Sequence, residues 1–155
     1  MKADQKLIDK LNELLKDELT AINQYFVHAE MCEDWGYEGL SNQIKQRSIQ
    51  EMKHAEALIE RILFLEGRPI VSDLSDIHIG KEIPKMFVND KHSEEIAIKG
   101  YNEGIKLCTE LGDNATKTIL EGILKDEDQH LDEIEEHMDQ IEMMGLPYYL
   151  TTVKK

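Results

Sequence analysis

Four long segments of the chain repeat their apolar residues every three or four positions, the spacing that places them on one face of an α-helix. The segments cover about residues 5–35, 40–66, 84–111 and 115–144. Glycine or proline interrupts the chain between successive segments, and no part shows the polar–apolar alternation of a half-buried β-strand. The pattern therefore predicts an all-α fold built from four long helices.

The connections between these segments differ in length. The first and third are short, so each is expected to join two antiparallel helices. The middle connection, residues 67–81, has no helical period and is long enough to run along the bundle. We therefore expect a four-helix bundle with one long crossover between helices 2 and 3, which would make those two helices parallel.

Single glycine and proline residues refine this prediction. Pro84 suits the first turn of the third helix, where its missing N–H group costs little. Gly100 and Gly104 lie one turn apart and indicate a close approach to another helix. Gly145 and Pro147 end the fourth helix, after which a short C-terminal helix completes one domain that spans the whole chain, residues 1–155.

The charge balance excludes some classes of partner. The chain has 32 Asp and Glu against 18 Lys and Arg, a formal net charge of −14, which disfavours binding to nucleic acid or to an anionic membrane. The longest apolar run in the helices, 62–65, cannot span a bilayer, and the N-terminus lacks the apolar core of a secretory signal. Cys32 and Cys108 form no metal-binding or disulfide pattern. We expect a cytoplasmic protein with two free, buried thiols.

Each predicted helix carries a carboxylate inside its apolar stripe, and two of the helices add a histidine three residues later. A Glu and a His at this spacing share one helix face. A buried carboxylate is unfavourable unless it is paired or binds a metal ion. The residues concerned are Glu18, Glu51, His54, Glu94, Glu127 and His130.

The spacing of these residues repeats along the chain. Glu51 follows Glu18 by 33 residues, Glu127 follows Glu94 by the same 33, and the two sets are offset by 76 residues. Two copies of one helical hairpin would bring four Glu and two His together at mid-bundle. Oxygen-rich ligands with two imidazoles suit a pair of iron or manganese ions, and the charge of four carboxylates balances that of two divalent ions. The alternative is that these side chains lie on the surface of an acidic bundle.

The sequence resembles the bacterioferritins along nearly its whole length. The resemblance rests on these stretches: Glu18-Leu-Thr-Ala-Ile-Asn-Gln-Tyr25, Trp35-Gly36, Glu51-Met-Lys-His54-Ala55, Ile62-Leu-Phe-Leu-Glu-Gly67, and Asp126-Glu127 with His130. It implies a ferritin-like bundle whose subunits assemble as two-fold dimers into a hollow homo-oligomer of 24. It also implies that Fe(II) is oxidised by O2 or hydrogen peroxide and that the Fe(III) mineral is stored inside the cage.

The resemblance assigns roles to the six candidate residues. They would hold two iron ions per subunit in a ferroxidase centre. Glu51 and Glu127 would bridge the two irons. Glu18 and His54 would serve one iron, and Glu94 and His130 the other.

A haem site is also implied by the resemblance. Met52 points away from the bundle interior and would ligate the iron of haem b, or of a related porphyrin, shared between two subunits. From its position alone, Met52 better suits packing at a dimer interface, and only the Glu-Met-Lys-His context favours haem. Lys45 stands near this surface where the family commonly has an aromatic residue. In the family, a small ferredoxin that docks near the haem delivers electrons for iron release.

The remaining polar residues receive simpler assignments. Tyr25 lies two turns from Glu18 and is a candidate electron donor, a hydrogen-bond donor to a ligand, or a packing residue. Gln46 and Gln50 occupy positions where the family often has an inner-surface His and Asp, so an internal iron site is expected to be weak or absent. Four histidines without a preceding carboxylate are interpreted as ordinary surface or interface residues: His28, His78, His92 and His137.

Two other functions use parts of the same pattern. A rubrerythrin-like di-iron peroxidase or an oxygenase would have the same ligands, but the chain has no four-cysteine electron-transfer domain and no extra segment for a substrate pocket. A metal-free interaction or DNA-shielding protein of the small ferritin-like type conflicts with the acidic charge. It would also leave six buried titratable groups unexplained.

Overall fold

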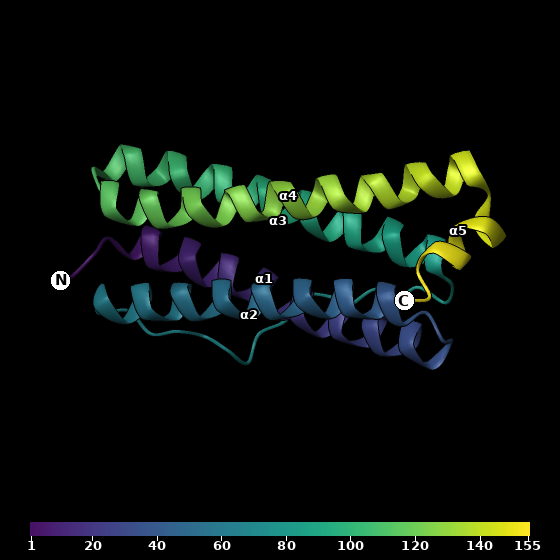
Figure 1. Cartoon of the computed structure of the whole chain (residues 1–155). Helices are drawn as coiled ribbons and strands as arrows, with labels where there is room; N and C mark the ends of the chain where they lie inside the picture. Colours follow the sequence, from purple (N-terminus) through teal and green to yellow (C-terminus); the bar gives the residue numbers. More distant parts are fainter.

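The computed structural model describes residues 1–155, which form five α-helices and no strand (Figure 1). The helices are α1 (Gln5–Asp34), α2 (Glu38–Phe64), α3 (Ile83–Leu111), α4 (Asn114–Met144) and α5 (Leu146–Thr152). Two antiparallel hairpins, α1–α2 and α3–α4, pack into one bundle, and α2 and α3 run in the same direction (Figure 1). The ferritin-like four-helix bundle, the long crossover and the short C-terminal helix are therefore confirmed. None of the helices has the length and apolar content that crossing a membrane requires.

The helix ends follow the sequence signals. Asp113 caps α4 by accepting a hydrogen bond from the backbone N–H of Thr116 at 2.9 Å, and Pro84 lies in the first turn of α3 as predicted. Gly112 ends α3 with φ 71°, a left-handed conformation that favours glycine. These signals set where each helix begins or ends relative to its neighbours, and so determine which residues meet at mid-bundle.

Two apolar clusters form the core, one toward each end of the bundle. Gly100 lies in the close approach that was predicted, since a Cβ atom there would come within 2.9 Å of the Leu14 side chain on α1. Cys32 and Cys108 are free and buried, each in a different cluster. On all four long helices the residues between the two clusters include buried glutamates, so the predicted polar centre separates two apolar layers.

The crossover between α2 and α3 lacks regular secondary structure, yet its backbone is held along α1. Four side chains of α1, spaced by one or two helical turns, accept hydrogen bonds from the backbone N–H groups of the crossover. These bonds satisfy donors that no helix or sheet pairs. The pairs are Asn12 Oδ1 with Ile70 N (2.9 Å), Thr20 Oγ1 with Ser75 N (2.9 Å), Gln24 Oε1 with His78 N (3.1 Å) and His28 Nε2 with Gly80 N (2.9 Å).

His28 is completely buried, so its assignment as a surface or interface residue was wrong. Because its Nε2 atom accepts from Gly80 N, its Nδ1 atom carries the proton and donates to Asp90 Oδ1 at 2.9 Å. Asp90 is also buried, accepts from Gln24 Nε2 at 2.9 Å and lies 3.8 Å from the guanidinium of Arg47. His28 thus connects the crossover to α3 through α1, a role that helical periodicity does not reveal.

We expect His28→Ala to lower the free energy of unfolding by about 2–4 kcal/mol, because it leaves the Gly80 N–H group and part of Asp90 without partners. Urea unfolding at fixed protein concentration measures this change, and faster cleavage of the crossover by subtilisin would locate it. The matched control is His92→Ala, at an exposed position, which should stay within about 0.5 kcal/mol of the parent protein. Equal effects of the two substitutions would contradict the proposed role of His28.

Candidate metal centre

The six predicted residues meet in the polar layer between the two apolar clusters. Each has at most 4% of its surface exposed. Their ligand atoms form two groups, and within each group the atoms lie within 4.8 Å of one another. The first group is Glu18, Glu51, His54 and Glu127, and the second is Glu51, Glu94, Glu127 and His130. The two groups share Glu51 and Glu127, the residues predicted to bridge two ions.

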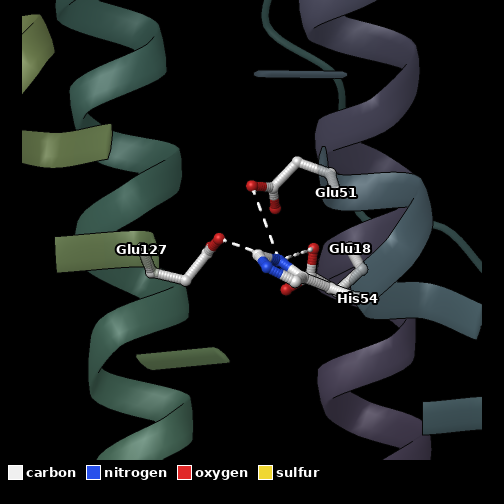
Figure 2. Close-up of side chains that lie close together, drawn as sticks. All are labelled: Glu18, Glu51, His54 and Glu127. Atoms are coloured by element: carbon white, nitrogen blue, oxygen red, sulfur yellow. Dashed lines mark ion pairs between the residues drawn. The ribbon is translucent and has the colours of Figure 1, made fainter. Parts of the chain in front are cut away.

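In the first group, Figure 2 shows the His54 ring between three carboxylates. The His54 Nδ1 atom lies 3.1 Å from Glu127 Oε1, 3.6 Å from Glu18 Oε2 and 3.7 Å from Glu51 Oε1. Since α1 supplies Glu18, α2 supplies Glu51 and His54, and α4 supplies Glu127, the group joins both hairpins.

The second group mirrors the first with His130 at its centre. The His130 Nδ1 atom lies 2.8 Å from Glu51 Oε1, and 3.4 Å from both Glu94 Oε1 and Glu127 Oε1. The imidazole rings of His54 and His130 have centroids 6.2 Å apart. The hairpin repeat seen in the sequence therefore becomes an approximate two-fold arrangement of ligands.

Each of the six residues places one buried polar atom here that has no hydrogen-bond partner. The atoms are Glu18 Oε2, Glu51 Oε1, His54 Nδ1, Glu94 Oε2, Glu127 Oε1 and His130 Nδ1. Buried polar atoms without partners are costly, so a cluster of six requires an explanation. Cations between them would satisfy all six, and the carboxylate and imidazole donors suit iron or manganese.

Without a cation, the pKa values indicate that the buried carboxylates repel one another. Burial and the neighbouring carboxylates of Glu18 and Glu127 raise the pKa of Glu51 well above its usual range. Burial, followed by the charge of Glu127, raises the pKa of Glu94 to about 8. Metal ions would remove this repulsion by neutralising the carboxylates.

The two imidazoles respond in the opposite direction to what burial alone would produce. Burial lowers the pKa of His54, but the adjacent carboxylates of Glu127 and Glu18 outweigh it and raise the pKa to about 11. The pKa of His130 is raised to about 9 in the same way, by Glu127 and Glu94. The same imidazoles hold the pKa of Glu127 well below its usual range.

Two buried tyrosines hold the outermost carboxylates. The Tyr25 hydroxyl donates to Glu94 Oε1 at 2.5 Å, and the Tyr101 hydroxyl donates to Glu18 Oε1 at 2.5 Å. Burial raises the pKa of both phenols, so both stay protonated donors. Of the roles considered for Tyr25, the structure shows the hydrogen bond. Tyr101 was missed, although it follows Glu94 by seven residues as Tyr25 follows Glu18.

The outer nitrogens of the two histidines also have partners. The His54 Nε2 atom lies 2.8 Å from Asp126 Oδ2, and the His130 Nε2 atom lies 2.5 Å from Gln50 Oε1. Such contacts orient an imidazole whose other nitrogen binds a metal ion. The predicted ligand set did not include either partner, but both stand at equivalent places in the 76-residue repeat.

Met52 and Lys45 lie away from this cluster, as the helix geometry predicted for Met52. Met52 is 50% exposed, whereas the six clustered residues are each at most 4% exposed. Lys45 forms ion pairs with Glu30 at 3.3 Å and Glu33 at 3.7 Å, next to the same exposed surface of α1 and α2.

We predict that metal binding at pH 7 releases at least two protons per chain. Both imidazoles are protonated without metal at this pH, because their pKa values of about 11 and about 9 lie above 7. A metal ion needs the Nδ1 lone pair, so it displaces one proton from each ring, and its affinity rises with pH. Anaerobic calorimetry with Zn²⁺ in buffers of different ionisation enthalpy counts these protons. A binding heat that is the same in every buffer would contradict the prediction.

Comparison with known proteins agrees with this geometry. A family model described as a ferritin-like domain matches residues 8–144. The bacterioferritin of Rhodobacter capsulatus is 40% identical over 145 residues, which cover 94% of this chain and 90% of the relative. Those of Streptomyces coelicolor (39% over 153 residues; 99% and 92% covered) and Brucella melitensis (37% over 149 residues; 96% and 92% covered) are similar. This chain belongs to the bacterioferritins, within the ferritin family.

Proposed function

We propose that this protein oxidises Fe(II) at the six-residue centre and stores the resulting Fe(III) as a mineral. The observation that carries the proposal is the pair of four-residue groups that share Glu51 and Glu127. This arrangement suits two substrate ions side by side. Two Fe(II) ions supply two electrons, which is the number that reduces O2 to hydrogen peroxide, or hydrogen peroxide to water.

The residues of the centre have separate tasks in this proposal. Glu18 and His54 hold one ion, Glu94 and His130 hold the other, and the two shared glutamates lie between them. Tyr25 and Tyr101 fix the terminal carboxylates by donating hydrogen bonds, so these side chains do not swing away between turnovers. Four carboxylates also stabilise the higher charge of Fe(III) relative to Fe(II).

Storage requires an assembly larger than this chain, and we propose the family's hollow homo-oligomer of 24 subunits, each a single domain over residues 1–155. The net charge of −14 per chain supports this role, because it would concentrate cations near the entry routes and the inner wall. A di-iron peroxidase of the rubrerythrin type would use the same ligands, but it would not accumulate iron.

We also propose that Met52 of two copies binds one haem b between them. The thioether fits such a group, because Met52 is 50% exposed on α2 and a methionine sulfur can ligate haem iron. Bound there, haem would supply a one-electron redox centre outside the bundle.

Glu127→Gln is expected to lower the initial rate of Fe(II) oxidation by about 100-fold or more, because it removes a carboxylate from both metal positions. Absorbance of the Fe(III) product after rapid mixing of Fe(II) with O2 measures the rate. Glu121→Gln is the matched control, since it makes the same change at an exposed position of α4. Glu18→Gln should act like Glu127→Gln. Unchanged rates in both, with normal assembly, would contradict the proposal.

For the haem proposal, Met52→Leu should abolish haem uptake while iron oxidation continues. Leucine keeps the apolar volume but has no sulfur to ligate iron. Absorbance near the Soret band after reconstitution with haem and gel filtration reports the bound group. Met143→Leu, at a residue that is 78% exposed, is the control. Equal haem binding by both variants would show that Met52 is not the ligand.

A further inference from the structure

The two halves of the centre share the contacts of each Nδ1 atom with three glutamates and one tyrosine–glutamate hydrogen bond each, but the outer partners of their histidines differ. In one half, His54 Nε2 lies 2.8 Å from the carboxylate of Asp126, and in the other, His130 Nε2 lies 2.5 Å from the side-chain amide of Gln50. Asp126 stands 76 residues after Gln50, the offset that relates the two hairpins. A carboxyl group and a side-chain amide therefore occupy equivalent places.

The direction of the hydrogen bonds follows from which nitrogen faces the centre. Both Nδ1 atoms point into the group of glutamates, so a metal ion would take the lone pair of Nδ1. The remaining proton then lies on Nε2, which donates to its outer partner. A carboxylate acceptor makes the imidazole a stronger metal ligand than a neutral amide does, because it stabilises the positive charge that the ring acquires.

Solvent in the pocket beside the two histidines reduces the difference between the carboxylate and amide acceptors but does not remove it. Gln50 and Asp126 line the same polar pocket of about 350 Å³, on the side of the bundle between α2 and α4. The Asp126 side chain is 36% exposed, so water weakens its effect. Both histidines remain almost fully buried, and their Nε2 atoms have no other protein partners.

We propose that the two metal positions differ in affinity, and that Gln50 causes the difference. The position of Glu18 and His54 fills first, and the position of Glu94 and His130 fills second. Outer partners of metal-binding histidines typically change metal affinity by about 10–100-fold, which gives the expected separation. This inference rests on the proposed function: oxidation needs two neighbouring ions, so Gln50 sets the Fe(II) concentration at which the pair is complete.

Anaerobic titration with Co²⁺ tests this proposal, with binding followed by visible absorbance and by calorimetry. The parent protein should bind two ions per chain in two steps whose dissociation constants differ by about 10–100-fold. His130→Ala should remove the weaker step and leave the tighter step in place. His54→Ala should remove the tighter one.

Substitutions that change Gln50 and Asp126 should alter the dissociation constants of the two Co²⁺ binding steps in a defined way. Gln50→Asp should raise the Co²⁺ affinity of the weaker step until the two steps merge. Asp126→Asn should lower the Co²⁺ affinity of the tighter step. The double exchange should restore two steps in reversed order. Gln46→Asp is the matched control, because it adds the same charge to the same pocket without a contact to His130. Its two steps should remain separate.

The possible failures are distinguishable. Two equal steps in the parent protein, or merging in Gln46→Asp as well as in Gln50→Asp, would overturn the proposal while leaving a centre for two metal ions. A third Co²⁺ ion bound by Gln50→Asp would show that the new carboxylate acts as a ligand itself and would also overturn it. Failure of the folded parent protein to bind Co²⁺ would contradict the proposed function as a whole.

Discussion

The rest of this structure depends on the burial of four carboxylates and two imidazoles between two apolar layers. Each of the six groups leaves one buried polar atom without a hydrogen-bond partner, and the pKa values of Glu94 and Glu127 shift in opposite directions. Buried charges without full compensation cost free energy, a cost that apolar residues at these positions would avoid. Divalent cations would compensate these buried charges, so the stability of the bundle is linked to metal binding.

The bundle keeps these groups in place by fixing its two hairpins to each other. Each tyrosine donates to a glutamate of the opposite hairpin, Tyr25 to Glu94 and Tyr101 to Glu18. The crossover adds a second connection, because the His28 ring bonds to the backbone of the crossover on one side and to Asp90 of α3 on the other. Both connections are buried, so a shift of one hairpin against the other would break hydrogen bonds that water could not replace.

Much of this could be predicted from the sequence, because helical periodicity and a repeat are both local signals. The four long helices begin and end within two residues of the predicted positions, and the six side chains chosen from the 33-residue spacing lie together in the structure. The role of His28 could not be predicted, since its partners lie on a crossover without periodicity. Tyr101 could have been found from the 76-residue offset, as could the unequal pair Gln50 and Asp126.

The central claim is that the centre feeds a mineral store. The most direct test loads the protein aerobically with Fe(II), and then measures iron and light scattering on the same gel-filtration peak. If the centre feeds a mineral store, the protein elutes as a cage-sized peak that carries far more than two irons per chain. A monomer or dimer with about two irons per chain would contradict storage and indicate a di-iron enzyme instead.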